Sequence, residues 1–150
     1  MTQVEQAREN SITHLEKVVY TAKAHTTGGR DGGASRTDDG RVDVKFTSPG
    51  KPGIGTNPEQ LFAVGWSACF LSAIKIVANK KRVELPDNVA IDVEVDLGIS
   101  QGAHALAARL NVSLPGVDRN VAQELAEGAH KICPYSRATQ GNIDVAINVV

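Results

Sequence analysis

Cysteine, aromatic residues and net charge are all scarce in this sequence. Its 150 residues include two cysteines, one tryptophan, two tyrosines and three phenylalanines, and the formal net charge is -1 at pH 7. Proteins that bind nucleic acid use a basic excess and a recognisable reading motif, and neither occurs here, so we expect no nucleic-acid partner. With only two cysteines, any chemistry of sulfur must involve Cys69 and Cys133.

Long apolar runs are also missing. The first ten residues, MTQVEQAREN, are polar and lack the apolar stretch of a signal peptide, so we expect no secretory signal. The longest uncharged apolar stretch, residues 61–74, is shorter than the roughly 20 residues that span a bilayer, so we expect no membrane segment. A cytoplasmic location is the resulting prediction. Thiols are kept reduced there, which disfavours a permanent disulfide and allows a transient one.

The chain has the length of one domain with a core of its own, residues 1–150, and its first 15 residues or so are predicted to be a peripheral extension. Residues 18–25 are predicted to form a strand, because they are rich in β-branched and small residues. The glycine-rich HTTGGRDGG that follows indicates a loop. The Asp39-Gly40 pair then predicts a hairpin, since apolar residues alternate after it.

The rest of the chain contains the strongest helix signal. In TNPEQLF, Asn57 can cap a helix and Pro58 suits its first position, and the helix is apolar nearly all round, which is typical of a buried helix. Its polar end reaches Arg82, and Pro86 closes it. Two alternating strands, a helix capped by Asp118 and a last strand follow. The order βββαββαβ has no regular βα alternation and predicts an α+β fold.

Four uses of the two cysteines stay open on the residues alone. Cys69, mid-helix on an apolar surface, is most simply a small buried hydrophobe. Cys133 precedes Pro134 and is predicted to lie at a helix N-terminus, where the dipole favours a thiolate. A metal site is disfavoured, because only His130 lies at ligand spacing from a cysteine and no Cys-x-x-Cys occurs. A hydrolase using Cys133 and His130 is a further alternative.

A reacting cysteine pair is the fourth use, and it needs a cation. The attacking sulfur must be a thiolate, while burial in apolar surroundings raises the pKa of a thiol. The GGRDG sequence offers Arg30, since its glycines let the backbone place the side chain in a site. On the residues alone, the favoured interpretation of Arg30 is a solvated loop charge, and that of Glu59 is an acid that complements the helix dipole.

Three motifs together resemble one family. GTNPEQLFAVGWSACFLSAIK and ICPYSRATQGNIDV resemble the two cysteine motifs of the organic hydroperoxide resistance proteins, a branch of the OsmC family, and HTTGGRDG resembles that family's arginine loop. The similarity extends in order from about residue 18 to residue 149. It implies an OsmC-like α+β fold and an intertwined homodimer, in which antiparallel-rich sheets wrap central buried helices.

The resemblance also implies an activity. Cys69 matches the cysteine that attacks an organic hydroperoxide, and Cys133 the one that closes a disulfide with it. Arg30 matches the arginine that holds the thiolate and the peroxide, and Glu59 the acid that pairs with this arginine. The implied enzyme is a thiol-dependent peroxidase without metal or bound cofactor, recycled by an external dithiol such as dihydrolipoamide or a lipoylated protein. The alternative is an OsmC-type redox-sensing or detoxifying protein without efficient turnover.

Two positions depart from the family's pattern. Trp66 stands where tyrosine is frequent and Arg137 where asparagine is common, so both bear on pocket shape and substrate preference. Leu61, Phe62, Trp66 and Phe70 are expected in the core, with some of them lining an apolar pocket.

Distance along the helix yields one more expectation. Glu59 and Cys69 are ten residues apart, which is about 15 Å in a helix. An Arg30–Glu59 pair therefore cannot easily reach Cys69 of its own chain, and we expect it to serve Cys69 of a second subunit.

Overall fold

The computed structural model describes residues 1–9 and 11–150; Asn10, within the predicted N-terminal extension, lies outside the described residues. The elements follow the chain in the order α1 (Gln3–Glu9), β1 (Ala24–Thr27), β2 (Ala34–Thr37), β3 (Asp43–Lys45), α2 (Pro58–Lys80), β4 (Ala90–Ser100), β5 (Ala103–Ser113), α3 (Arg119–Ile132), α4 (Pro134–Thr139) and β6 (Asp144–Val149).

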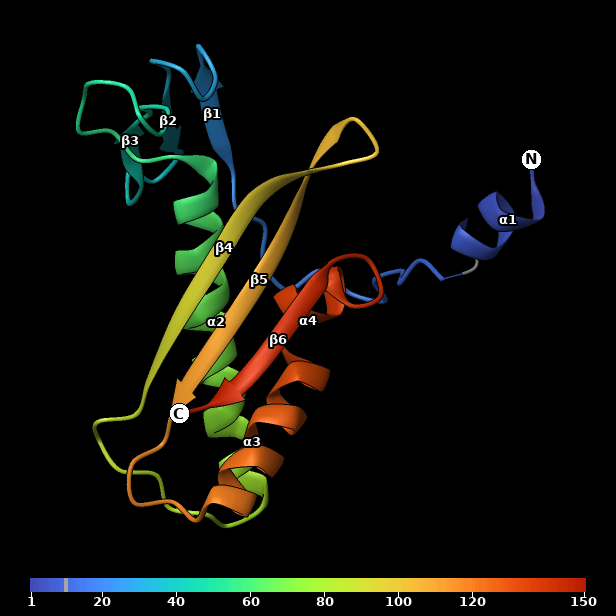
Figure 1. Ribbon diagram of the computed structural model, residues 1–150, viewed down its shortest axis with the longest axis vertical. Helices are drawn as coiled ribbons and strands as arrows, with labels where there is room; N and C mark the ends of the chain where they lie inside the picture. The colour runs from blue at the N-terminus through green and yellow to red at the C-terminus, as the bar shows by residue number, and fades with distance from the viewer. Residues whose placement is uncertain (10) are drawn as a thin grey trace.

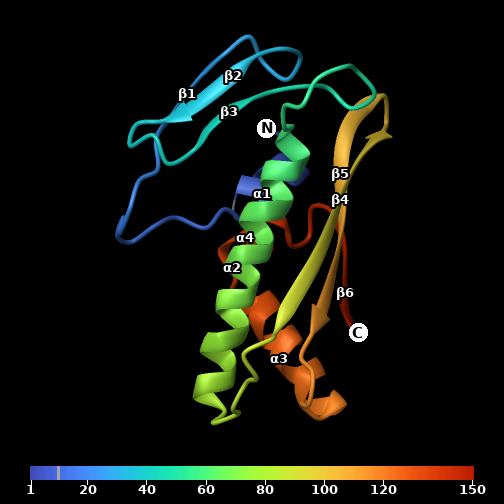
Figure 2. The ribbon, with the colours of Figure 1, turned by 90° about the vertical axis from the view of Figure 1, so that its left-hand side faces the viewer.

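Two separate three-stranded sheets frame one long helix. In the small sheet β1, β2 and β3 pair antiparallel in sequence order. In the large sheet β4 pairs antiparallel with β5, and β6 adds to β5 in parallel. Both views show the large sheet covered on one face by α2 and α3, with the small sheet at the N-terminal end of α2 (Figures 1 and 2). This arrangement confirms the predicted α+β class.

The core lies between the large sheet and the two helices. Trp66, Phe70 and Ile74 on α2 are fully buried, as are Leu110 on β5 and Leu125 on α3. Along β4 and β5 the apolar residues alternate with exposed polar ones, which directs one face of the sheet onto the helices. Burial of these side chains is the main force that holds the layers together.

The start of α2 is as predicted. Asn57 is extended and its side chain accepts a hydrogen bond from the backbone N–H of Gln60, while Pro58 takes the first helical position. Asp118 caps α3 in the same way, accepting from Asn120 and Val121. The helix α2 ends at Lys80, two residues before the predicted end, because Arg82 adopts a left-handed φ of 56°.

The exposed side of α2 corrects the expectation of a helix buried all round. Leu61, Val64 and Ile76 are 36%, 65% and 50% exposed in the chain. Over its full length, Pro58–Lys80, α2 has the length and apolar composition of a helix that could cross a membrane. The core helix of a globular protein has the same properties. One face of α2 is packed against β4 and α3, which favours the core-helix interpretation.

The predicted strand over residues 18–25 is wrong for most of its length. The strand β1 begins only at Ala24, and Val18, Val19 and Tyr20 are more than half exposed. A strand needs a neighbouring strand for its backbone groups, and the paired segments of the described chain do not include residues 18–23. Two short helices, α1 and α4, add to the order βββαββαβ, and α4 begins where a helix N-terminus was predicted at Cys133.

Candidate active site

The fold brings the two cysteines together in its centre. Cys69 lies in the middle of α2, and Cys133 is at once the last cap of α3 and the first cap of α4. Pro134 cannot continue α3 and opens α4 instead, as predicted. Cys133 is fully buried, Cys69 is partly buried, and both sulfurs are free thiols. Cys133 lies close enough to Cys69 for its thiol to raise the pKa of the Cys69 thiol, so the two residues form one local site.

This site does not contain an activated thiolate. Burial raises the pKa of Cys69 above its ordinary value, and the neighbouring Cys133 thiol raises it further. A backbone hydrogen bond from Tyr135, in the first turn of α4, acts in the opposite direction but is the weaker influence. The surroundings that one chain supplies therefore favour the neutral thiol.

A buried hydrogen bond lies one turn away from the cysteines. The indole Nε1 of Trp66 donates to the hydroxyl of Ser136 over 3.2 Å, and both side chains are fully buried. Trp66 precedes Cys69 by three residues and Ser136 follows Cys133 by three. Sequence reasoning noted Trp66 only as a departure from the family's pattern and missed Ser136. A lone tryptophan three residues before a cysteine was the available signal.

Arg30 and Glu59 form the second predicted pair. The guanidinium donates two hydrogen bonds to the carboxylate, of 2.7 and 3.2 Å, in a bidentate arrangement. This pairing lowers the pKa of Glu59 and raises that of Arg30. Glu59 lies in the first turn of α2, and its side chain is 14% exposed against 43% for Arg30.

The loop that carries Arg30 is built from glycines and anchored to the next loop. Gly28 has a φ of 73°, which residues with a side chain rarely adopt, and a side chain on Gly33 would collide with the backbone of Thr27. Asp31 forms an ion pair of 2.6 Å with Lys51. The loop that carries Arg30 is thus shaped by its glycines and tied by the Asp31–Lys51 ion pair to the next loop, at the N-terminal end of α2.

The structure leaves the two pairs apart within one chain. Glu59 and Cys69 are about 15 Å apart along α2, and Arg30 is not among the groups that shift the pKa of Cys69. A cavity of about 340 Å³ adjoins Glu59, and Val93, Val95 and Leu97 of β4 form its apolar wall. Trp66 and Phe70 are core residues, so the predicted apolar pocket does not form around these two.

The alternative uses of the cysteines find little support. His130 packs against Phe70, its Nδ1 is buried without a hydrogen-bond partner, and burial lowers its pKa. A Cys–His hydrolase requires a hydrogen bond between the histidine and the cysteine. Within the described residues, no hydrogen bond joins His130 to Cys133. Across residues 1–9 and 11–150, no three His, Cys, Asp or Glu side chains are grouped to hold a metal ion.

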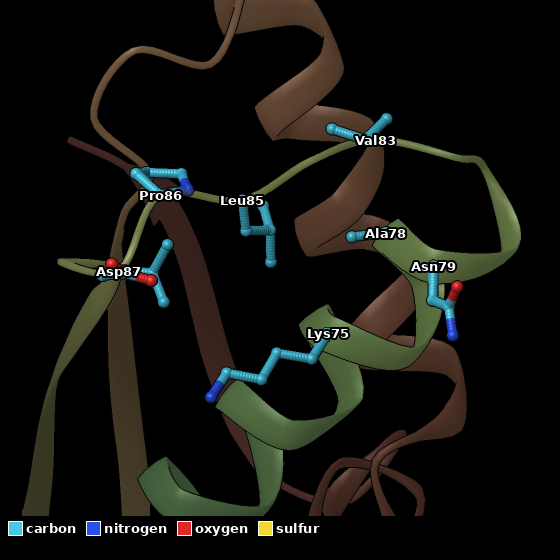
Figure 3. A pocket seen from close by; sticks show the side chains of 8 residues that line it. Lys75, Ala78, Asn79, Val83, Leu85, Pro86 and Asp87 are labelled. Carbon is cyan, nitrogen blue, oxygen red and sulfur yellow. The ribbon is translucent and has the colours of Figure 1, made fainter.

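Another cavity lies at the far end of α2, away from both pairs. It measures about 380 Å³, and its lining includes Lys75, Asn79 and Asp87. Figure 3 shows Lys75 extending from α2 beneath Leu85 and Pro86 of the following loop. None of the predicted site residues lines it, so it plays no part in the site described above.

Comparison with known proteins places this fold and these cysteine motifs in one family. The sequence matches the OsmC-like protein family over residues 48–148. The organic hydroperoxide resistance protein of Xanthomonas axonopodis pv. citri (strain 306) is 46% identical over 138 residues, which cover 89% of this chain and 96% of that protein. The protein OhrB of Bacillus subtilis (strain 168), also named for organic hydroperoxide resistance, is 40% identical and covers 87% of this chain and 98% of its own.

Solved structures agree. The crystal structure of an organic hydroperoxide resistance protein from Legionella pneumophila superposes with a TM-score of 0.82 at 40% identity, covering 89% of this chain and 98% of that one. The crystal structure of OhrB of Bacillus subtilis superposes with a TM-score of 0.80 at 38% identity, covering 89% of this chain and 100% of that one. The chain belongs to the OsmC family, in its organic hydroperoxide resistance branch.

Proposed function

We propose that this protein is a thiol-dependent peroxidase that reduces organic hydroperoxides to alcohols. The observation that carries the proposal is that the fold brings the chain's two cysteines, Cys69 and Cys133, together at its core as free thiols. Two neighbouring free thiols are suited to a disulfide that forms and breaks in each cycle. The organic hydroperoxide resistance named in its relatives supports the substrate class.

The chemistry takes three steps. The Cys69 thiolate attacks the terminal oxygen of the hydroperoxide, the O–O bond breaks, and the alkoxide takes a proton and leaves as an alcohol, so that Cys69 becomes a sulfenic acid. The Cys133 sulfur then attacks this sulfur, releasing water and forming the disulfide. A dithiol such as dihydrolipoamide reduces the disulfide by exchange and is itself oxidised to a cyclic disulfide. No bound cofactor takes part.

The first step needs a cation that the chain does not bring to its own Cys69. Burial holds the pKa of Cys69 high, whereas an adjacent guanidinium would lower it. We therefore place the Arg30–Glu59 pair of one subunit at Cys69 of its partner in a homodimer. Glu59 fixes the guanidinium by two hydrogen bonds, which leaves its other donors free for the thiolate and the peroxide.

Two exposed apolar regions support the homodimer. Leu61, Val64 and Ile76 lie on one side of α2, which a second copy of the helix would cover. Val18, Val19 and Tyr20 are also exposed and have the composition of a strand. Pairing of this segment with the partner's sheet would give its backbone the ladder that it lacks in one chain, and would intertwine the subunits.

The cavity beside Glu59 fits the organic part of the substrate. Its wall of Val93, Val95 and Leu97 would accept an alkyl chain, while Arg30 binds the polar peroxide end. The proposal thus predicts a preference for organic hydroperoxides over hydrogen peroxide, because only the former bury apolar surface in this cavity.

Peroxidase turnover with an alkyl hydroperoxide and dihydrolipoamide tests the proposal. Wild type should turn over, Cys69→Ser should be inactive, and Cys133→Ser should react once and then stop as a sulfenic acid. If wild type oxidises once but turns over poorly with every dithiol, the redox-sensing alternative holds. If wild type consumes no hydroperoxide, or Cys69→Ser matches it, the cysteines are core residues and the proposal is wrong.

A further inference from the structure

Two contacts of the same spacing join α2 to α4. In one, Trp66 of α2 donates a hydrogen bond to Ser136 of α4; in the other, Cys69 of α2 lies near Cys133, the N-cap residue of α4. Residues three apart on a helix lie on the same side, so each helix presents its two partners together. Both views show α4 beside the middle of α2 (Figures 1 and 2). The position of Cys133 relative to Cys69 is therefore linked to the position of Ser136 relative to Trp66.

The hydrogen bond between Trp66 and Ser136 is a specific contact in buried, apolar surroundings. Trp66 and Ser136 are both fully buried, so the indole N–H has no water as a substitute partner. The neighbouring side chains pack as edge-to-face pairs, Phe62 on Trp66 and Phe62 on Tyr135. Such apolar contacts hold α4 near α2 but allow sliding, whereas one buried donor and one acceptor fix a register.

The Tyr135 side chain of α4 lies directly over a glycine of α2. A Cβ atom on Gly65 would collide with the hydroxyl group of Tyr135, so glycine lets the Tyr135 ring keep this position along α2. Thr139 closes the other end of α4, where its hydroxyl donates to the backbone carbonyls of Tyr135 and Ser136. The short helix thus has one specific polar contact to α2 through a side chain, made by Ser136.

We propose that Trp66 and Ser136 are positioning residues that hold Cys133 within bonding reach of Cys69. A disulfide requires an S–S distance of about 2.05 Å and a narrow range of dihedral angles. Because the hydrogen bond fixes the register of α4, it raises the effective concentration of one thiol at the other. This role rests on the proposed function, since it serves a disulfide that forms in each catalytic cycle.

A redox titration tests the proposal without any peroxide. The protein is equilibrated with mixtures of reduced and oxidised dithiothreitol, and mass spectrometry of alkylated samples gives the equilibrium constant for the Cys69–Cys133 disulfide. Trp66→Phe removes the donor and Ser136→Ala the acceptor, and each should lower this constant about tenfold, the usual scale for a buried hydrogen bond broken on one side. The double variant should lower it no further than the single variants, because both remove the same bond.

Phe70→Leu is the matched control. Phe70 is as deeply buried on the same helix, one residue after Cys69, and its replacement loosens the core without touching the hydrogen bond. It should lower the thermal stability at least as much as Ser136→Ala, yet leave the equilibrium constant within about twofold of wild type. The proposal is overturned if the single variants match wild type, or if Phe70→Leu lowers the constant as much as they do.

A second measurement separates this proposal from the proposed function. After one equivalent of an alkyl hydroperoxide, Ser136→Ala should close its disulfide more slowly than wild type, while the rate of the first oxidation stays the same. With excess hydroperoxide, a second molecule oxidises the longer-lived sulfenic acid, so Ser136→Ala should accumulate more sulfinic acid at Cys69 than wild type does. If no variant reacts with hydroperoxide but the titration shows the expected losses, the proposed function is wrong and the positioning role stands. Unchanged closure and unchanged over-oxidation would contradict the positioning role alone.

Discussion

The two pairs of candidate site residues differ in burial and in the contacts that hold them. The cysteines lie in the core, between α2 and the α3–α4 junction, where packing and one buried hydrogen bond fix them. Arg30 and Glu59 lie at the N-terminal end of α2, and a loop with several glycines presents the arginine with almost half of its side chain exposed. One chain therefore contains two neighbouring cysteines and an ordered cation, but keeps them apart.

This difference is the reason why the proposed function places Arg30 and Glu59 of a second subunit at Cys69. Burial gives the sulfurs a fixed geometry but raises the pKa of Cys69. Exposure leaves Arg30 accessible, and its bidentate partner Glu59 restricts it to one orientation. Each region has what the other lacks, so the proposed dimer interface would combine them into one site with a thiolate in a defined geometry. Variants that separate the two regions test whether the regions act together.

The largest effect is expected from Arg30→Ala. Loss of a preorganised charge should lower kcat/KM for an alkyl hydroperoxide on the order of a hundredfold, the usual scale for such a group. A heterodimer of an Arg30→Ala chain and a Cys69→Ser chain then tests the subunit arrangement. Such a dimer keeps one intact site only if Arg30 and Cys69 come from different chains.

Co-expression with two affinity tags isolates this heterodimer. It should recover about half of the wild-type activity, one site of two, while each parent homodimer stays nearly inactive. A heterodimer as inactive as its parents would mean that Arg30 acts on the cysteine of its own chain.

The next effect concerns the exposed side of α2. Val64→Asp puts a charge on the proposed interface and should give a monomer by analytical ultracentrifugation, because a buried unpaired charge is costly. In the monomer the pKa of Cys69, measured by alkylation against pH, should be higher than in the dimer, and peroxide reduction should fall at least about tenfold. Oxidation by diamide to the Cys69–Cys133 disulfide should continue.

Ala146→Asp provides the control for this variant. Ala146 is exposed on the outer face of the large sheet, opposite Arg109 in the ladder, so a charge there is solvated. This variant should remain dimeric and active. A monomeric Val64→Asp that keeps full activity would show that one subunit forms the whole site.

How far the sequence anticipated this molecule differs between local and long-range features. Caps at Asn57 and Asp118, the turn at Asp39-Gly40 and the alternation along β4 and β5 depend on neighbouring residues, and the structure confirms them. The strand over residues 18–25 was wrong because its partner strand cannot be read from its own composition.

The site shows the same division. The Arg30–Glu59 ion pair followed from the resemblance to a family, and the structure confirms it as a contact. The hydrogen bond between Trp66 and Ser136 joins residues seventy positions apart. Their separation in the sequence gives no sign of this contact, because the two residues meet only when α4 packs on α2. Contacts of this kind have to be seen in the structure.

A smaller effect is expected from Glu59→Gln. The amide accepts one hydrogen bond from Arg30 in place of two charged ones, so kcat/KM should fall about fivefold to tenfold. Arg30 holds the pKa of Glu59 below its ordinary value, which means that the carboxylate stabilises the fold at neutral pH. This contribution persists above the ordinary pKa of a glutamate and is lost as the pH falls through the lowered value.

Chemical denaturation at several pH values measures this contribution. The difference in unfolding free energy between wild type and Glu59→Gln should be constant from pH 8 to pH 6 and should shrink only in strongly acidic solution. If the difference already shrinks near pH 6, the carboxylate is not held by Arg30 in solution.

The smallest effect on the unfolding free energy should come from His130 in the buried region, at a higher pH than the effect of Glu59. Burial lowers the pKa of His130, whose Nδ1 has no hydrogen-bond partner in the described residues. The unfolded chain therefore binds a proton more readily than the folded one, and stability declines as the pH falls below about 6.5, the ordinary value for histidine. His130→Gln cannot titrate, so its unfolding free energy should decline less between pH 7 and pH 5. Equal declines would mean that the His130 ring reaches solvent in the folded protein, and that the core around the cysteines is less closed than its packing indicates.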